Sequence, residues 1–186
     1  MRIVAGRKRG LRLAELGAGD AGAHLRPTSD RVRESLFNLL EARGDVTLEG
    51  AAVLDLFAGT GALGLEALSR GAARVTFVDD GTTARALLRE NIARAGAQGQ
   101  AKVWRRDATA LGDARGQSFG LVFLDPPYGR GLGQTALASA VAGGWLAPGA
   151  TIVWEENAPM APPAGFARLD ARRYGDTHVT LLRAPA

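Results

Sequence analysis

An acid, two prolines and an aromatic residue follow the apolar run 121–124: Asp125, Pro126, Pro127 and Tyr128. Each proline fixes φ at about −65° and biases the preceding residue towards extended conformations, so the Asp125 carboxylate and the adjacent carbonyl oxygens are held as rigid acceptors. Two acceptors suit an exocyclic amino group, and the aromatic ring offers a face on which a flat base can stack. These four residues are therefore candidate catalytic residues for methyl transfer to a nitrogen. The alternative is an ordinary proline-containing turn after a buried strand.

The glycine spacing G-x-G-x-x-G occurs at residues 59, 61 and 64, after the apolar run that begins at residue 52. Such glycines let the backbone turn tightly and let a ligand approach the main chain, which suits NAD and S-adenosylmethionine equally. Asp55 favours S-adenosylmethionine, because the cationic amino group of a methionine moiety needs a nearby acid and a pyrophosphate does not. Asp79, about twenty residues further on, is expected to bind ribose hydroxyls.

Four acids each end or follow a successive predicted strand, namely Asp55, Asp79, Asp107 and Asp125. Parallel strands bring their carboxyl ends to one edge of a sheet, so this recurrence predicts a single site. Asp107 and the backbone N–H of Ala108 are expected to face an adenine edge. The predicted cofactor-binding residues are Asp55, Phe57, Ala58, Gly59, Gly61, Asp79, Asp107, Ala108 and Asp125.

From residue 52 onwards the pattern alternates strand and helix, which predicts a parallel, doubly wound α/β sheet. A hairpin turn at 174–176 is expected to make the last strand of the seven antiparallel. Strands are expected at 52–57, 74–79, 101–105, 119–124, 150–155, 166–173 and 177–183, and helices at 62–70, 82–95 and 132–142.

The first 33 residues carry eight basic residues against three acids, a charge of +5 in a chain whose net charge is +4. This asymmetry predicts contact with a phosphate backbone. Short runs at 2–5 and 11–14 flank a basic tip and predict a hairpin. Residues 26–30 predict the start of a helix that runs to about residue 42, because they supply hydroxyl caps at Thr28 and Ser29 and an acid, Asp30, in the first turn. The residues predicted to bind nucleic acid are Arg7, Lys8, Arg9, Arg26, Thr28, Arg31 and Arg33.

At 186 residues, with 46% hydrophobic and 23% charged residues, the chain is expected to form one globular domain with a small appendage. The motifs place the expected methyltransferase domain at 46–186, and the basic segment 1–45 is the expected nucleic-acid-binding appendage. It has no cysteine and two histidines distant from each other, which argues against disulfides and a metal site. Without a signal sequence or an apolar run long enough for a membrane span, we expect a cytoplasmic protein with no membrane contact, and a monomer.

With these residues in hand, the chain resembles the bacterial small-subunit rRNA guanine-N2 methyltransferase family (RsmD-type) over nearly its whole length. The resemblance implies a Rossmann-like class I methyltransferase that transfers a methyl group from S-adenosylmethionine to the exocyclic N2 amine of one guanosine in the 16S rRNA of the small ribosomal subunit. The motifs that carry it are Met1-Arg2-Ile3-Val4-Ala5-Gly6 with Arg9-Gly10, residues 26–38, residues 55–68, Asp125-Pro126-Pro127-Tyr128 and Tyr174-Gly175-Asp176-Thr177.

The chain departs from this family where Asp79 replaces the common Glu and Gly81 replaces a second acid. Other readings stay open. An adenine-N6 methyltransferase shares the Asp-Pro-Pro-Tyr motif but needs a longer target-reading region, and a protein-amide methyltransferase usually begins this motif with Asn. A non-catalytic RNA-binding protein would not need the four acids, and a nicotinamide oxidoreductase leaves the motif unexplained. No role is assigned to Asp80, Glu155 or Glu156.

Overall fold

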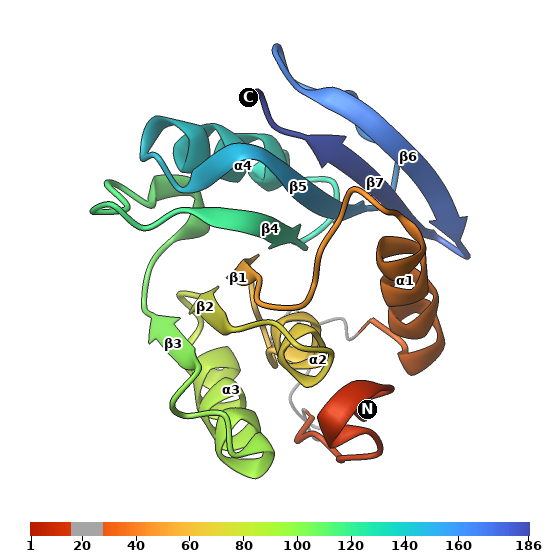
Figure 1. Cartoon of the computed structure of the whole chain (residues 1–186). Helices are drawn as coiled ribbons and strands as arrows, with labels where there is room; N and C mark the ends of the chain where they lie inside the picture. Colours follow the sequence, from red (N-terminus) through yellow and green to blue (C-terminus); the bar gives the residue numbers. More distant parts are fainter. Residues whose placement is uncertain (16–27) are drawn as a thin grey trace.

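The computed structural model describes residues 1–15 and 28–186, in which one sheet has the strand order β3-β2-β1-β4-β5-β7-β6 (Figure 1). The strands are β1 (Ala52–Leu56), β2 (Arg74–Val78), β3 (Ala101–Trp104), β4 (Phe119–Leu124), β5 (Leu146–Glu156), β6 (Ala167–Tyr174) and β7 (Thr177–Arg183). The α-helices are α1 (Asp30–Ala42), α2 (Ala62–Ser69), α3 (Thr82–Ala95) and α4 (Leu132–Ala142), and the short 3-10 turns are η1 (Gly6–Lys8) and η2 (Ala108–Ala110). The predicted doubly wound fold is confirmed.

Strands β1 to β5 are parallel, and β7 is antiparallel to both β5 and β6. The predicted hairpin is confirmed, with Tyr174 opposite Thr177 at its closed end. Strand β5 begins four residues before the predicted position, because it continues through Pro148 and Gly149. Its register against β4 shifts in this region, and a proline is tolerated where regular ladder pairing is interrupted.

The two faces of the sheet bury alternate residues of each strand, as the period of a strand requires. Val53 and Phe123 pack with α1, α2 and α3, whereas the neighbouring Leu54 and Leu124 pack with α4. Figure 1 shows this three-layer arrangement, with α4 on one side of the sheet and the other three helices on the opposite side. Parallel strands covered on both faces explain the nearly continuous apolar runs in the sequence.

Helix α1 begins where the sequence predicts it, because the Ser29 hydroxyl accepts a hydrogen bond from the Val32 N–H at 3.3 Å. Residues 1–14 fold back on themselves, with an isolated antiparallel bridge between Arg2 and Arg12. Ile3 and Leu13 are buried in the same apolar cluster as α1, α2 and α3. The N-terminal segment is therefore packed on the body of the protein.

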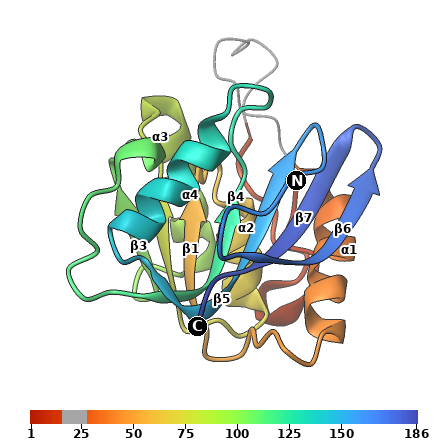
Figure 2. The same ribbon diagram turned by 90° about the horizontal axis from the view of Figure 1, so that it is seen from above.

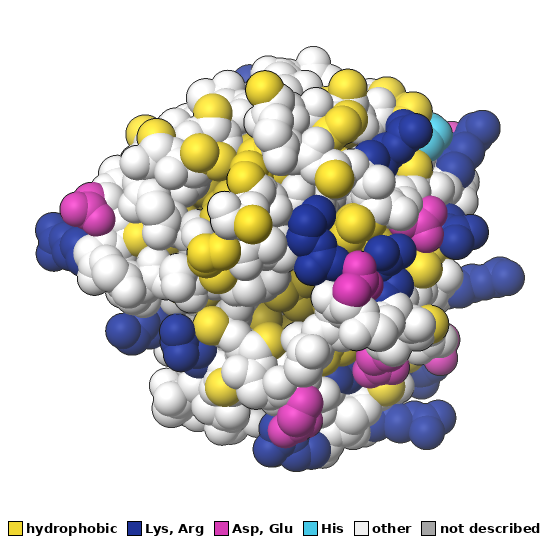
Figure 3. All heavy atoms as spheres, turned by 45° about the horizontal axis from the view of Figure 1, so that its top comes forward, with side chains coloured by type: hydrophobic (Ala, Val, Ile, Leu, Met, Phe, Trp, Pro, Cys, Tyr) yellow, Lys and Arg dark blue, Asp and Glu magenta, His cyan; other side chains and the backbone are white. Residues whose placement is uncertain are grey.

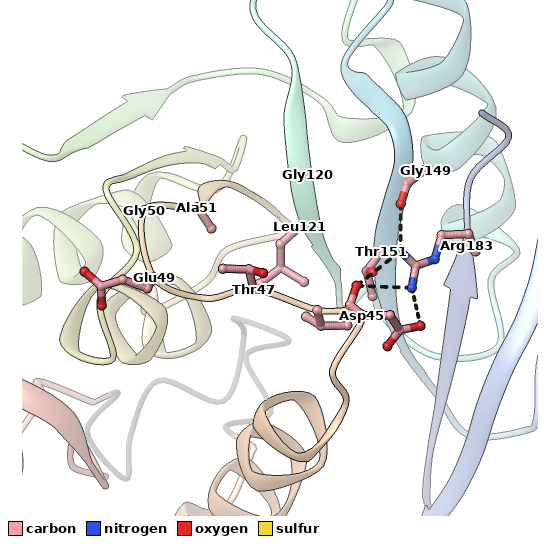
Figure 4. Close-up of a pocket in the computed structure, with 11 residues that line it drawn as sticks. Asp45, Thr47, Glu49, Gly50, Ala51, Gly120, Leu121, Gly149, Thr151 and Arg183 are labelled. Atoms are coloured by element: carbon pink, nitrogen blue, oxygen red, sulfur yellow. Dashed lines mark hydrogen bonds and ion pairs between the residues drawn. The ribbon is translucent and has the colours of Figure 1, made fainter.

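A groove of about 250 Å³ lies at the edge of the sheet where β1 and β4 begin (Figure 4). Arg183 donates to the Asp45 carboxylate at 2.5 Å and to the Gly149 carbonyl at 3.1 Å, which joins the loop before β1 to β7 and to the early part of β5. This groove is at the opposite edge from the strand ends that carry the predicted acids. Within the described part of the chain, no helix has the length and apolar character that crossing a membrane requires.

Candidate functional site

The carboxyl ends of β1 to β5 form one edge of the sheet, called here the carboxyl edge. In Figure 2 the ends of β4 and β5 point to the top of the view, and the C terminus lies at the bottom. In each of β1, β2, β4 and β5, a buried residue on the face of the sheet that packs against α1, α2 and α3 is followed two positions later by an acid at the carboxyl edge. These acids are Asp55, Asp79, Asp125 and Glu155.

The loop after β1 has the backbone conformation that its glycines allow. Phe57, Gly59 and Gly61 all have positive φ, at 58°, 56° and 78°. Positive φ is rare for a phenylalanine, and such conformations cluster at ligand sites. The turn closes where the Gly61 N–H donates to the Ala58 carbonyl at 2.7 Å, and the Ala58 N–H donates to Val78 of β2 at 3.1 Å.

Asp79 holds this loop in place. Its two carboxylate oxygens accept backbone N–H groups from Gly59 at 2.9 Å and Gly81 at 2.8 Å. Burial raises the pKa of Asp79, while these two hydrogen bonds oppose the rise. A carboxylate oxygen has more than one acceptor lone pair, so the fixed group retains capacity for a ribose hydroxyl. The neighbouring Asp80 is exposed, as expected of a solvated residue.

Asp55 is buried, with only 2% of its surface exposed, and accepts the Gly64 N–H of α2 at 3.0 Å. Burial raises the pKa of Asp55 to about 8, against the effect of the Gly64 hydrogen bond, and the nearby charges of Asp79 and Glu155 raise it further. Within residues 1–15 and 28–186, Asp55 forms no ion pair. A cation at this position would compensate an otherwise unbalanced acidic group, so the site fits the amino group of S-adenosylmethionine.

Asp107 differs from the other three predicted acids, because it caps the turn η2. Its carboxylate accepts the backbone N–H of Thr109 at 2.8 Å and the Thr109 hydroxyl at 2.6 Å. Asp107 is exposed and Ala108 is buried. The Asp107 carboxylate therefore stabilises the turn η2, which begins at Ala108.

The tetrapeptide Asp125–Tyr128 follows β4 directly and begins the loop that leads to α4. The Asp125 N–H lies 3.5 Å from the Leu56 carbonyl of β1, and Pro126 is buried. The Tyr128 and Thr177 hydroxyls are 3.2 Å apart, which joins the motif to the start of β7. Asp125, Pro127 and Tyr128 are each half-buried. The motif is therefore held between neighbouring strands at the carboxyl edge.

Glu156 fixes the backbone that follows the motif. One of its carboxylate oxygens accepts the N–H groups of both Gly129 and Asn157, each at 3.0 Å. Its neighbour Glu155 is also buried, with 2% of its surface exposed. Burial raises the pKa of Glu155 to about 7, although the Thr28 hydroxyl and the charge of Arg33 act in the opposite direction.

The structure corrects the prediction that Arg33 contacts RNA, because this side chain is fully buried. Its guanidinium donates to the Thr28 carbonyl at 3.1 Å, to Asp30 at 2.8 Å and to the Arg2 carbonyl. It also lies 3.7 Å from the buried Glu66. Arg33 therefore joins the N-terminal segment to α1 and α2.

The other predicted RNA-binding residues have different surroundings. Arg31 is exposed on the first turn of α1, whereas Thr28 is half-buried and its hydroxyl donates to Glu155. The prediction for Arg26 lies outside the described residues. The basic tip is exposed, and consists of Arg7, Lys8 and Arg9.

The basic tip lies at the end of α2 that is remote from the glycine loop. The Lys8 N–H donates to the Ser69 hydroxyl at 2.9 Å, and a Cβ on Gly6 would lie 2.0 Å from the Ser69 carbonyl oxygen. Ser69 is the last residue of α2, which begins beside the glycine loop at Ala62. Eight helical residues span about 12 Å, so the tip is separated from the carboxyl edge by the length of this helix.

Two buried polar residues that sequence reasoning missed hold the N-terminal segment in this position. Glu66 accepts the N–H groups of Val4 at 2.8 Å and Ala5 at 3.0 Å. Asn91 exchanges two hydrogen bonds with the backbone of Ala14 and also donates to the Thr60 carbonyl of the glycine loop at 2.9 Å. The available signal was a polar residue among the mostly apolar buried positions of each helix.

The comparisons with known proteins agree with this architecture. The family described as "Conserved hypothetical protein 95" matches residues 1–183. Ribosomal RNA small subunit methyltransferase D of Escherichia coli K12 is 40% identical over 169 residues, which cover 89% of this chain and 81% of that protein. The protein of the same name from Haemophilus influenzae is 36% identical over 180 residues, covering 94% of this chain and 89% of that protein.

Among solved structures, a putative methyltransferase (yhhF) of Escherichia coli superposes with a TM-score of 0.83 at 36% identity, covering 100% of this chain and 98% of that chain. A putative methylase of Haemophilus influenzae gives a TM-score of 0.79 at 32% identity, covering 100% and 98%. The sequence and structural matches extend over both the N-terminal segment and the sheet.

Proposed function

The chain belongs to the Conserved hypothetical protein 95 family, that of the ribosomal RNA small subunit methyltransferase D proteins, and from this premise we propose that it methylates the exocyclic N2 amine of a guanosine in small-subunit rRNA, with S-adenosylmethionine as the methyl donor. The observation that carries the proposal is the meeting of Asp55, Asp79 and the Asp125–Tyr128 motif at one edge of the sheet. An acidic, partly buried site suits a cationic cofactor.

The residues that would hold the cofactor are the loop 57–61 with Asp55 and Asp79, together with Asp107 and Ala108. When bound, S-adenosylmethionine supplies an electrophilic methyl group on a sulfonium centre. Asp55 is suited to the amino group because it is buried and has no cationic partner in the described chain. Asp79 is suited to ribose hydroxyls because backbone hydrogen bonds fix its carboxylate.

The catalytic contribution of the motif is positioning, since the guanine amine is a weak nucleophile whose lone pair is delocalised into the ring. We assign to Asp125 and the Pro126 carbonyl the acceptance of the two amine hydrogens, which directs the nitrogen lone pair towards the methyl group. Tyr128 stacks on the target base after this base has been extruded from the RNA. The amine proton is released to Asp125 or water after transfer, so no histidine base is needed.

The test is transfer of labelled methyl from S-adenosylmethionine to small ribosomal subunits isolated from a strain without the corresponding activity, followed by nucleoside analysis. We expect one N2-methylguanosine per subunit. Label in N6-methyladenosine, or no label in RNA, overturns the proposal. Asp125→Ala should lower turnover by about 10²-fold or more through loss of positioning, with the fold retained and only a modest loss of cofactor affinity. Asp113→Ala, at an exposed acid before β4, is the matched control and should leave turnover unchanged.

A further inference from the structure

Two exposed arginines stand beside the carboxyl edge, on elements that contact the site. Arg31 lies on the first turn of α1, just after Thr28, whose hydroxyl is bonded to Glu155. Arg173 precedes the last residue of β6 at the closed end of the β6–β7 hairpin. Both side chains are exposed. They come from segments far apart in the sequence but adjacent in the fold.

Hydrogen bonds place these two segments next to the catalytic motif. Ser35 of α1 donates to the Tyr174 hydroxyl at 3.2 Å, which joins α1 to the end of β6. Tyr174 is paired with Thr177, whose hydroxyl is 3.2 Å from that of Tyr128. The hairpin end that carries Arg173 is therefore attached both to α1 and to the proposed base-stacking residue.

The charges of Arg31 and Arg173 are not neutralised by any ion pair within residues 1–15 and 28–186. The neighbouring Arg172, in contrast, is paired with Asp170 at 3.0 Å. Arg173 also donates its Nε–H to the Gly175 carbonyl at 2.8 Å, which orients its guanidinium at the turn. In Figure 3, Lys and Arg side chains project along the right of the view, the side of β6 and α1 in Figure 1, and others project at its left and lower margins.

We propose that Arg31 and Arg173 bind the RNA phosphates that flank the target nucleotide. An enzyme that extracts a base from its stack must hold the backbone beside that base, and arginine suits a phosphate oxygen pair. The basic tip lies a helix length away and is left to contact RNA further from the target. This inference rests on the proposed function, because it takes RNA as the substrate.

Arginine on an exposed edge strand has another explanation, since charged side chains prevent edge strands from pairing with other molecules. Arg168 provides the internal control. It is exposed on the same strand, forms no ion pair in the described chain, and lies near the opposite end of β6. If these arginines only protect the edge strand β6, substitution of Arg168 and of Arg173 should affect RNA binding equally. A phosphate site beside the target nucleotide requires that only Arg173 contribute to RNA binding.

The experiment measures binding of the full chain to small-subunit rRNA in the presence of S-adenosylmethionine, over a series of salt concentrations. Arg31→Gln and Arg173→Gln should each reduce the slope of log affinity against log salt concentration by about 0.7 to 0.9, and the double variant by about twice as much. Arg168→Gln should keep the wild-type slope. Arg173→Lys should restore most of the slope, because the positive charge is retained. Thermal unfolding verifies that each variant is folded.

Equal effects of Arg168→Gln and Arg173→Gln, or an unchanged slope in the double variant, overturn the inference. In turnover assays the two glutamine variants should raise KM for the subunit and leave KM for S-adenosylmethionine unchanged. If the glutamine variants show the expected decrease in slope but the wild-type chain transfers no methyl group to the RNA, only the proposed function is contradicted. A wild-type chain that binds no RNA at low salt contradicts both.

Discussion

The Thr28 hydroxyl lies 3.2 and 3.3 Å from the two carboxylate oxygens of Glu155 and donates to that carboxylate. This contact joins residues separated by 127 positions in the sequence, and it attaches the start of α1 to the end of β5. Because Glu155 is buried, its polar group depends on such partners. The position of Arg31 at the carboxyl edge follows from this attachment.

Thr28→Val should lower the free energy of unfolding by about 1–3 kcal/mol, because it leaves a buried acceptor without its hydroxyl donor. Thr28→Ser keeps the donor and should stay within about 0.5 kcal/mol of the wild type. Urea unfolding at pH 8, where Glu155 is largely ionised, measures both. Similar losses for Val and Ser would contradict this role of the hydroxyl.

The stability of the free protein should fall as the pH rises from about 4 to 8. The pKa of Asp55 is about 8 in the folded chain against an ordinary 3.8, so between these values the folded state keeps a proton that the unfolded state has released. Stabilisation is complete below the ordinary pKa and is lost as the pH rises through the folded value. Asp55→Asn, which still accepts the Gly64 N–H, should flatten this dependence.

Glu155, whose pKa rises from 4.5 to about 7, contributes in the same direction at lower pH. Because Glu155 titrates in both proteins, the slope of the free energy of unfolding against pH should differ between the wild type and Asp55→Asn over the whole range from about pH 4 to 8. Urea unfolding at several pH values provides the measurement. Parallel curves for the wild type and Asp55→Asn would show that Asp55 is not the titrating group.

Substitution of two arginines on α1, Arg31 and Arg33, should have very different effects on stability. Arg33→Gln removes the buried charge that serves Asp30 and Glu66, and should destabilise the fold by about 3–5 kcal/mol. Arg31→Gln changes an exposed side chain and should alter stability by about 0.5 kcal/mol or less. Chemical unfolding measures the free energy of unfolding of both variants. Comparable decreases would contradict a buried structural role for Arg33 and an exposed position for Arg31.

Gly64→Ala should destabilise by about 1–3 kcal/mol through overpacking. An added Cβ would lie 2.4 Å from the Phe77 ring and 2.8 Å from a Val75 methyl group, so β2 would have to move away from α2. Gly99→Ala is the control, because its Cβ would meet no atom within 4 Å. Thermal unfolding of both variants tests this, and a neutral Gly64→Ala would mean that β2 and α2 separate without cost.

Much of the fold could be predicted because local signals agreed with the tertiary structure. The start of α1 followed from a capping hydroxyl at Ser29, and the central strands followed from apolar runs that end in turns. The position of Asp55 and Asp79 at the carboxyl edge could be predicted because each ends or follows a parallel strand. The same alternation pointed to Glu155, two residues after the buried Val153, but no motif marked it.

Three features depend on contacts that no local pattern contains. Arg33 resembles any charged helix residue until Glu66 of another helix lies beside it. Asn91 could be seen only as a polar residue on a helix, because the Ala14 backbone that it holds lies 77 positions away in the sequence. The end of α2 against which the basic tip packs is set by the pairing of Gly6 with Ser69, which lies more than sixty positions away.

The single Glu156 oxygen that accepts the N–H groups of Gly129 and Asn157 has a consequence for selectivity. It joins the loop after β4 to the residue that follows β5, so the surface to which we assign the base is held in place before a base binds. Binding should then carry a smaller entropic cost of loop ordering. For the same reason, this surface should adapt poorly to a base whose amino group lies elsewhere on the ring.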